Sequence, residues 1–239
     1  CRMQGSSVVF REFGIDIVRC AGCGHVYSTH ELPADYDEYF GDEVPEGQHF
    51  YWDAAHRPMY EAFGEQYLKG RRGRLLDLGC GLGFFVRFVA NNYPWEALGV
   101  ETSAAAVKFA RETLGLQSVF HCAVNEASFP DQHFDVICLW DVIEHLADPG
   151  PLLMELSRLL KNDGVLFLHT PNVHLQLPKA RIKRLIFGMD PGRHYLEARD
   201  HLNLYSMKTL ERVLARAGFD RVRFVHLPPI QSVAGSTNP

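Results

Sequence analysis

A glycine-rich turn between a buried strand and a helix is the feature that most limits the folds open to this chain. Residues 75–85 read LLDLGCGLGFF, an apolar run that leads into Gly79, Gly81 and Gly83 in a G-x-G-x-G spacing. Glycine tolerates the left-handed backbone conformations of a tight turn and lets bare N–H groups approach a ligand. The sequence therefore predicts a ligand-binding loop at the end of a strand.

Strand and helix patterns alternate along the rest of the chain. Ser103 and Ser206 are good N-terminal caps, and the helices that they begin run toward glycine stops. Alternating strands and helices favour an α/β fold, with a mostly parallel sheet and helices on both faces. Such a sheet binds ligands beyond the carboxyl ends of its strands. We expect strands at residues 74–78, 97–101, 118–122, 134–140, 165–170 and 221–227, and helices at 54–67, 104–114, 152–160 and 207–217.

The composition sets broad limits on the function. The 239 residues carry a net charge of −5, so no global basic field favours nucleic acid as a partner. No apolar run reaches the roughly 18 residues that a membrane span requires, so we expect no stable membrane insertion. Six cysteines without a dense framework favour a reducing, cytoplasmic location.

Two acidic residues discriminate among the ligands that the glycine loop could bind. Asp77 lies two residues before Gly79, where it would repel a phosphate and attract an ammonium group. Glu101 ends the next strand and could accept hydrogen bonds from two ribose hydroxyls. No lysine follows the glycines, as a phosphate-binding P-loop would require. S-adenosylmethionine, which has a ribose and an ammonium group but no phosphate, fits both carboxylates. NAD, in a sugar-nucleotide oxidoreductase, is the alternative.

Five motifs in order resemble the class I S-adenosylmethionine-dependent methyltransferases, and among them the family-23 type. They are LLDLGCGLG, GVETS, FPDQHFDVICLWDVIEHLADP, GVLFLHTPN and HLNLYSMKTLERVLARAGF, and they span about residues 71–225. The resemblance implies a Rossmann-like fold and methyl transfer to a small-molecule acceptor. The acceptor classes it suggests are a sugar, a polyketide or quinone-type hydroxyl, and a lipid-linked glycan. It does not choose between O-, C- and N-methylation.

The same resemblance implies a set of cofactor-binding residues. Asp77 and the glycine loop would contact the methionine part, and Glu101 the ribose. The acidic residue that the family often places near the adenine is replaced by Ala123, so Val124 or Asn125 would make that contact. The expected cofactor-binding residues are Asp77, Gly79, Cys80, Gly81, Gly83, Glu101, Val124, Asn125, Trp140 and Asp141.

Methylation of a hydroxyl or an acidic carbon requires a base near the strand ends. DVIEHLADP follows the fourth predicted strand and contains Glu144 and His145, and RDHLNLYS contains His201. Because histidine has the unperturbed pKa closest to neutrality, we rank His145 first, His201 second and Glu144 third as catalytic candidates. Loop shaping is the alternative role of each. Asp141, Glu144 and His145 together could instead bind a divalent cation.

A second motif, CAGCGHVYS, places Cys20 and Cys23 in a C-x-x-C-G knuckle, which is half of a tetrahedral zinc site. Members of this methyltransferase group often carry a zinc ribbon that opens with C-x-x-C-G-S. Here Cys1 is followed by Gln4 in place of the second cysteine. A structural zinc on Cys1, Cys20 and Cys23 is the expectation, completed by His25 or by an upstream residue. Loss of the metal and a disulfide are the alternatives.

These motifs suggest three parts: a zinc-ribbon-like segment at residues 1–30, a linker with a helix at 31–70, and the methyltransferase domain at 71–239. An insertion at 173–205 combines basic and apolar residues. We interpret it as a substrate lid whose basic face suits a phosphate. An amphipathic helix that covers the sheet and a membrane-surface helix are the alternatives. For the whole chain, a catalytically silent binding module is a further alternative.

Overall fold

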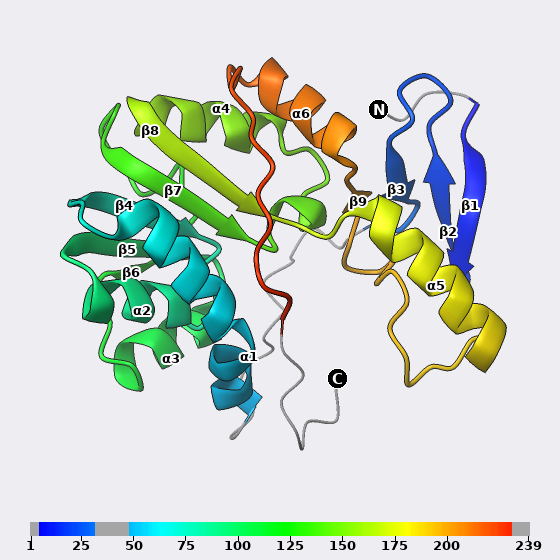
Figure 1. The fold of residues 1–239 in the computed structure, drawn as a ribbon, viewed down its shortest axis with the longest axis horizontal. Coiled ribbons are helices and arrows are strands. Elements are labelled where there is room, and N and C mark those ends of the chain that lie inside the picture. The colour runs from blue at the N-terminus through cyan, green and yellow to red at the C-terminus, as the bar shows by residue number, and fades with distance from the viewer. Residues whose placement is uncertain (1–4, 32–47, 231–239) are drawn as a thin grey trace. The chain divides into compact units, whose positions relative to one another are not determined.

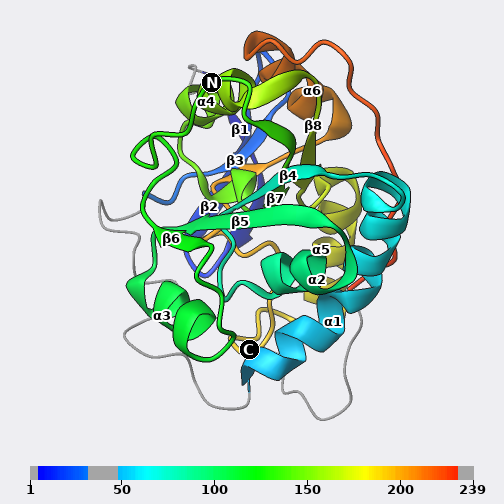
Figure 2. The same cartoon turned by 90° about the vertical axis from the view of Figure 1, so that its left-hand side faces the viewer.

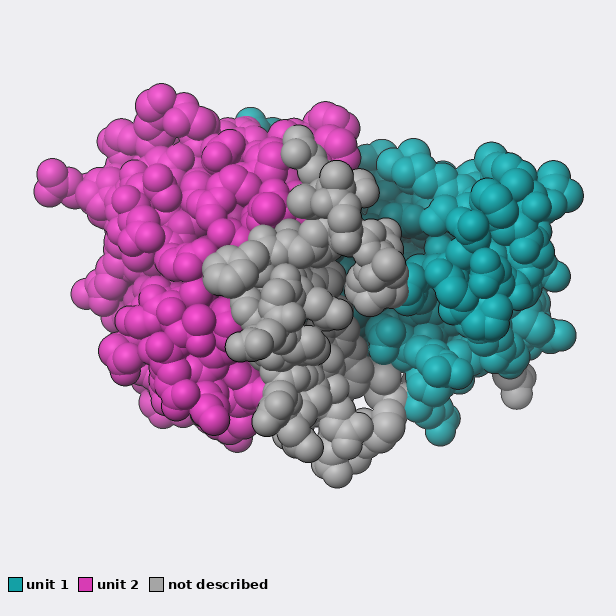
Figure 3. Space-filling view, turned by 90° about the horizontal axis from the view of Figure 1, so that it is seen from below, with its two compact units in different colours: residues 1–34, 141–157, 168–223 teal, residues 35–140, 158–167, 224–239 magenta. Residues whose placement is uncertain are grey.

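The computed structural model describes residues 5–31 and 48–230, which belong to two compact units (Figure 3). The first unit comprises Cys1–Ala34, Asp141–Ser157 and Leu168–Arg223. The second comprises Asp35–Trp140, Arg158–Phe167 and Phe224–Pro239. Each unit therefore combines segments that are far apart in the sequence. Residues 32–47 of the predicted linker, and Cys1, lie outside the described residues.

The second unit is built on a five-stranded sheet with the order β6-β5-β4-β7-β8 (Figure 1). β4 pairs in parallel with β5 and with β7, and β5 pairs in parallel with β6. The order reverses beside β4, so the switch point of the sheet lies between β4 and β7, where α/β proteins bind ligands. The Rossmann-like α/β fold is thereby confirmed. The strands are β4 (Gly73–Leu78), β5 (Trp95–Glu101), β6 (Val119–His121), β7 (Phe134–Trp140) and β8 (Leu160–His169).

Three helices lie along one face of this sheet (Figure 2). They are α1 (Gln48–Phe63), which continues into the π-helical turn η2 (Gly64–Leu68), α2 (Phe84–Asn92) and α3 (Ala104–Glu112). Their buried face is rich in aromatic rings, which contribute much apolar area and pack edge to face. α3 begins as predicted, because the Ser103 hydroxyl accepts a hydrogen bond from the N–H of Ala106 at 3.3 Å.

The first unit contains a small antiparallel sheet with the order β1-β2-β3-β9. Its strands are β1 (Ser7–Glu12), β2 (Ile15–Arg19), β3 (Val26–Ser28) and β9 (Asn203–Leu204). Phe13 and Gly14 join β1 to β2 with φ values of 46° and 88°, the left-handed pair that suits a two-residue hairpin. The fourth strand of this N-terminal sheet thus comes from the 173–205 insertion.

Helix α5 (Val173–Phe187) opens that insertion, and Asn172 caps its first turn. Val173, Leu177 and Ala180 form one buried cluster with side chains of β1, β2 and β3. The helix therefore covers the N-terminal sheet. An amphipathic helix was among the interpretations of the insertion, but its partner sheet was not anticipated.

A buried carboxylate joins the N-terminal sheet to the 173–205 insertion. Glu12, at the end of β1, accepts hydrogen bonds from the N–H groups of Tyr195 (3.1 Å), Leu196 (3.2 Å) and Ala198 (3.1 Å). Backbone donors offset the cost of burying a charged group. The loop that Glu12 holds leads into His201 three residues later, so the N-terminal hairpin supports the segment that carries a candidate catalytic residue.

The predicted strand at 221–227 is wrong, because no helix or strand is assigned between residues 219 and 230. Val225 and Leu227 pack on the core of the second unit, whereas Phe224 is exposed. The apolar alternation reflects one-sided packing of an extended segment, without the ladder of hydrogen bonds that makes a strand. The preceding helix α6 (Met207–Arg216) begins at a capping box of Ser206 and Thr209, with the Ser206 cap as predicted.

The remaining predicted elements lie within several residues of their observed bounds. Helix α4 (Gly150–Leu159) connects β7 to β8, and the 3-10 turn η3 (Ile143–His145) precedes it. None of the helices in the described part of the chain combines the length and apolar character needed to cross a bilayer.

Candidate active site

The three glycines of the loop after β4 all adopt positive φ values, 66° at Gly79, 52° at Gly81 and 81° at Gly83. The N–H groups of Gly79 and Cys80 donate to the carbonyl of Val100 at 2.9 and 3.2 Å, which ties the loop to β5. A Cβ on Gly83 would lie 2.9 Å from a methyl carbon of Leu116. Gly83 is therefore required for close packing in the protein interior, quite apart from any ligand.

Cys80 lies buried inside this loop and packs over β5. A Cβ on Gly99 would lie 2.7 Å from the Cys80 sulfur, so the strand needs glycine at that position. Burial, and then the charges of Asp77 and Glu101, raise the pKa of the Cys80 thiol well above its ordinary value. The thiol stays neutral and serves as a packing group, since only the thiolate is a strong nucleophile.

Glu101 is the residue that organises the loop. One of its carboxylate oxygens accepts a hydrogen bond from Gly81 N–H at 2.8 Å. The other accepts from Thr102 N–H at 2.9 Å and from Ser103 N–H at 3.0 Å. These three donors fix the carboxylate at the carboxyl end of β5, beside the loop. Glu101 was expected to bind ribose, which stays a prediction, and its role in holding the glycine turn in shape was not predicted.

Asp77 is only 2% exposed, and its Oδ1 has no hydrogen-bond partner among the described residues. Burial, and then the nearby charge of Glu101, raise the pKa of the Asp77 carboxyl well above its ordinary value. A buried carboxylate without a compensating donor or cation is costly. A ligand that presents an ammonium group would supply that missing partner, so the residue fits the methionine end of S-adenosylmethionine.

The turn after β6 carries the residues expected near the adenine. Val124 is buried and Asn125 is exposed. The N–H of Ala123 donates to the carboxylate of Glu126 at 3.0 Å. An acidic side chain is therefore present at this turn, three residues later than the family pattern places it. The Glu126 carboxylate closes the turn, and the adenine contacts expected of Val124 and Asn125 stay predictions.

Trp140 ends β7 and Asp141 follows it, and the structure gives them different surroundings. Trp140 packs against the rings of Phe63, Phe85 and Phe167, with centroid distances of 5.8, 5.1 and 4.9 Å. The Asp141 carboxylate accepts a hydrogen bond from the Nδ1–H of His169 at 2.8 Å.

Burial alone would lower the pKa of the His169 imidazole, but its hydrogen bond to Asp141 and the Asp141 charge raise that pKa above its ordinary value. Asp141 therefore forms a charge-assisted pair with His169. Cofactor contact by Trp140 and Asp141 stays a prediction.

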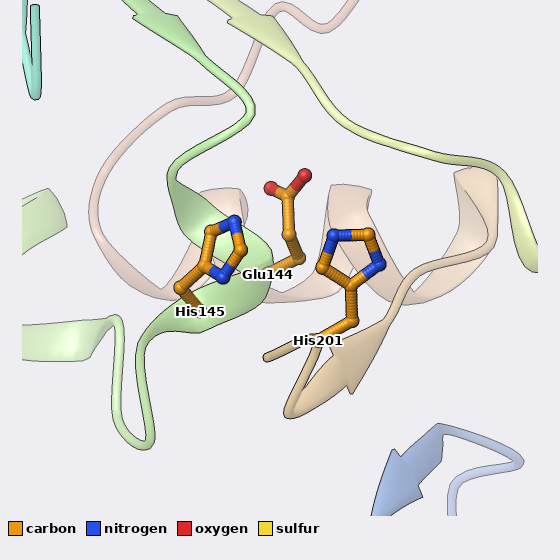
Figure 4. A group of neighbouring side chains, drawn as sticks. All are labelled: Glu144, His145 and His201. Atoms are coloured by element: carbon orange, nitrogen blue, oxygen red, sulfur yellow. The ribbon is translucent and has the colours of Figure 1, made fainter. Parts of the chain in front are cut away.

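The three catalytic candidates lie together in the first unit (Figure 4). Glu144 and His145 belong to η3, and His201 follows the loop held by Glu12. One potential ligand atom from each of the three lies within 4.8 Å of those of the other two. The Nδ1–H of His145 donates to the carbonyl of Asp200 at 2.9 Å. The folding of 173–205 thus brings together residues that are 56 positions apart in the sequence.

The interior around these three side chains favours their neutral forms. Burial, and then the neighbouring His201, lower the pKa of the His145 imidazole, and burial lowers that of His201. Burial, and then the charge of Asp141, raise the pKa of the Glu144 carboxyl well above its ordinary value. Burial, and then Glu144, raise the pKa of the Tyr205 phenol. Perturbed groups in such number are typical of functional sites.

The knuckle of the N-terminal sheet holds two of the expected zinc ligands. A hydrogen bond from the backbone of Cys23 lowers the pKa of the Cys20 thiol below its ordinary value, although burial acts in the opposite direction. The Nε2–H of His25 donates to the side chain of Asn203 at 2.9 Å. Among the described residues, no three-ligand group includes Cys20 and Cys23. Cys1 lies outside the described residues.

Replacing Asp77 with asparagine is expected to stabilise the ligand-free protein. The folded protein holds the Asp77 proton more tightly than the unfolded chain, so its contribution to stability falls as the pH rises from about 4. At neutral pH, Asp77→Asn should raise the free energy of unfolding by about 1 kcal/mol. Urea denaturation at several pH values measures this, and the difference should vanish below about pH 4. The exposed Asp163→Asn is the matched control. A less stable Asp77→Asn protein at pH 7 would contradict the assignment.

The profile of a family of methyltransferase domains, family 23, matches residues 46–223. A probable S-adenosylmethionine-dependent methyltransferase of Mycolicibacterium smegmatis is 28% identical over 170 residues, which cover 71% of this chain and 60% of that protein. A ubiquinone biosynthesis O-methyltransferase of Rhodopseudomonas palustris is 32% identical over 106 residues, 41% of this chain and 40% of that protein. The chain thus spans about half the length of these relatives.

The fold has counterparts among solved structures. A SAM-dependent methyltransferase of Thermotoga maritima superimposes with a TM-score of 0.52 and 21% identity, over 72% of this chain and 76% of that one. The choice between S-adenosylmethionine and NAD is thereby decided for S-adenosylmethionine as the cofactor of this domain. Because the family profile covers well over half of its residues, this chain belongs to the methyltransferase domain family 23.

Proposed function

We propose that this protein transfers the methyl group of S-adenosylmethionine to a hydroxyl of a small-molecule acceptor. The observation that carries the proposal is the buried Asp77 carboxylate, with an oxygen that lacks a hydrogen-bond partner, beside a glycine loop shaped by Glu101. Bound S-adenosylmethionine would supply an electrophilic methyl group on a positively charged sulfur. Asp77 would neutralise the ammonium group, and Glu101 would use its remaining lone pairs for the ribose hydroxyls.

A hydroxyl acceptor is supported by the relative named as a ubiquinone biosynthesis O-methyltransferase. The surface of α5 supports an acceptor that also has an apolar part and an anionic group, as a lipid-linked intermediate has. Leu185 is 87% exposed, and residues 175, 182 and 186 are exposed too, whereas Val173 and Leu177 are buried. The same helix contains four basic residues and no acidic one: Lys179, Arg181, Lys183 and Arg184.

The methyl carbon forms a bond to the acceptor oxygen while its bond to sulfur breaks, and the electron pair of the carbon–sulfur bond stays on sulfur. The hydroxyl proton of the acceptor must leave in the same reaction. His145 is the first candidate to take that proton. Because its Nδ1–H donates to the Asp200 carbonyl, the ring lone pair lies on Nε2, the form that accepts a proton. His201 is the second candidate and Glu144 the third. Alignment of the acceptor can lower the activation barrier by roughly 7–11 kcal/mol, which is more than a general base contributes.

The N-terminal knuckle is proposed to hold a structural zinc. Cys20 and Cys23 have the spacing of a zinc knuckle, and the turn that carries them is closed by a hydrogen bond from Gly24 N–H to the Cys20 carbonyl at 2.9 Å. Cys1 is the third proposed ligand. The metal would brace the sheet that α5 covers and would take no part in the chemistry.

S-adenosylhomocysteine should raise the melting temperature of the protein, since a ligand of the native state stabilises it by mass action. Gly81→Arg should abolish this shift, because the new side chain would occupy the space beside the glycine loop that the methionine part of the cofactor is proposed to take. Gly115→Arg is the matched control, since Gly115 also has a positive φ but faces open space. Calorimetry with S-adenosylhomocysteine and NAD gives the affinities. Binding of NAD in place of S-adenosylhomocysteine would refute the proposal.

His145→Ala should lower kcat by roughly 10²-fold or more, with unchanged affinity for S-adenosylhomocysteine. His201→Ala should slow turnover less, and His226→Ala, which alters an exposed histidine after α6, should leave it unchanged. Turnover is measured as S-adenosylhomocysteine release with a hydroxylated acceptor. If neither His145→Ala nor His201→Ala slows the reaction tenfold, alignment alone carries catalysis.

Cys20→Ser should remove a stoichiometric zinc ion that elemental analysis detects in the purified protein. Cys122→Ser, which alters a half-buried cysteine of the second unit, should leave the metal content unchanged. Zinc-free protein with the same melting temperature as the purified protein would contradict a structural zinc.

A further inference from the structure

Glu144, His145 and His201 offer more than a proton acceptor, because they gather three metal-binding atoms in one place. The Glu144 side chain lies beside the two imidazole rings, which are in contact with each other (Figure 4). The ring centroids are 5.0 Å apart, and the three potential ligand atoms lie within 4.8 Å of one another. Ligands bound to one zinc ion at about 2.0–2.2 Å lie somewhat closer together than this. Small side-chain rotations would therefore complete the set.

The buried Glu144 carboxylate is an independent observation that points to a cationic ligand at this cluster. Its side chain is 1% exposed, and neither oxygen makes a hydrogen bond of ordinary length and angle, although Thr170 and Asp141 lie close enough to influence it. The hydroxyl of Tyr205 also lacks a partner among the described residues, and the Thr170 hydroxyl has none besides its interaction with the Glu144 carboxylate. Buried polar atoms are normally satisfied, so a concentration of exceptions indicates a missing ligand.

The surroundings of the two histidines suit metal binding. A metal-bound histidine typically donates its other N–H to a carbonyl or carboxylate, which orients the ring. The Nδ1–H of His145 makes such a bond to the carbonyl of Asp200 at 2.9 Å, which places the lone pair on Nε2. The ring of His201 lies 3.2 Å from a carboxylate oxygen of Glu197. Glu197 therefore adds negative charge beside the cluster and steadies the second ring.

We infer that Glu144, His145 and His201 bind a divalent transition-metal ion such as Zn²⁺. Two imidazoles and one carboxylate favour such an ion over Mg²⁺ or Ca²⁺, which prefer oxygen ligands. The set differs from the one suggested by sequence, because Asp141 is paired with His169 and His201 takes its place.

Three protein ligands leave a coordination position open, as in catalytic zinc sites. A hydroxyl bound there would lose its proton to solvent more readily, a consequence that rests on the proposed function. The ion would then occupy the lone pair of His145 that otherwise takes the proton. Metal binding itself does not depend on methyl transfer.

The test is a titration of chelator-stripped Cys20→Ser protein with Co²⁺, followed by calorimetry and visible absorption. The Cys20→Ser background removes any binding at the cysteine knuckle. We expect one Co²⁺ per chain, competition by Zn²⁺ and no comparable binding of Mg²⁺. Glu144→Gln and His201→Ala should each weaken Co²⁺ binding by roughly 10-fold or more, and the exposed His174→Ala should not change it.

Circular dichroism establishes that each variant is folded, and Glu144→Gln preserves the size of the side chain. If Cys20→Ser does not fold, the same comparison is made between the wild-type protein and Glu144→Gln. Absence of binding at millimolar Co²⁺, or binding that neither variant weakens, would overturn the metal site. Loss of S-adenosylhomocysteine binding alone would overturn the proposed function and leave the metal site standing.

Discussion

The hydrogen bonds accepted by the Glu101 carboxylate are the interactions on which the shape of the glycine loop after β4 depends. The carboxylate accepts hydrogen bonds from Gly81, Thr102 and Ser103, and thereby joins the loop after β4 to the end of β5. Parallel pairing of β4 with both β5 and β7 puts this junction beside the switch point of the sheet. Because the loop is held from within the protein, its positive φ values are already in place before a ligand arrives. Such preorganisation reduces the ordering cost of binding.

Three buried carboxylates differ in how far the protein satisfies their hydrogen-bonding capacity. Glu12 receives backbone N–H groups from Tyr195, Leu196 and Ala198, so its charge is satisfied and its role is to hold a loop. Asp77 and Glu144 are equally buried but have oxygens without such donors. An unsatisfied buried carboxylate persists only where something else justifies its cost. The two incomplete groups fall in the two places to which the sequence motifs also point.

Helices and strands could be predicted from the sequence where a few neighbouring residues determine them. The caps at Ser103 and Ser206 and the apolar runs of the sheet predicted the observed helices and strands, since each depends on a few adjacent positions. The pairing of β3 with β9 could not be read in this way, because the two strands are more than 170 residues apart. For the same reason, a glutamate at position 12 gives no sign that its partners lie at 195–198.

The site shows the same division between local and distant information. Asp77 was predicted from its spacing to the glycine loop, and Glu101 from its place at the end of the next strand, so both predictions used local information. The grouping of His201 with Glu144 and His145 depends on the path of the 173–205 insertion, which is set by α5 packing on the N-terminal sheet and by the Glu12 hydrogen bonds. The N-terminal hairpin is therefore more than an appendage to the methyltransferase fold. By holding the loop before His201, it helps determine which side chains meet Glu144.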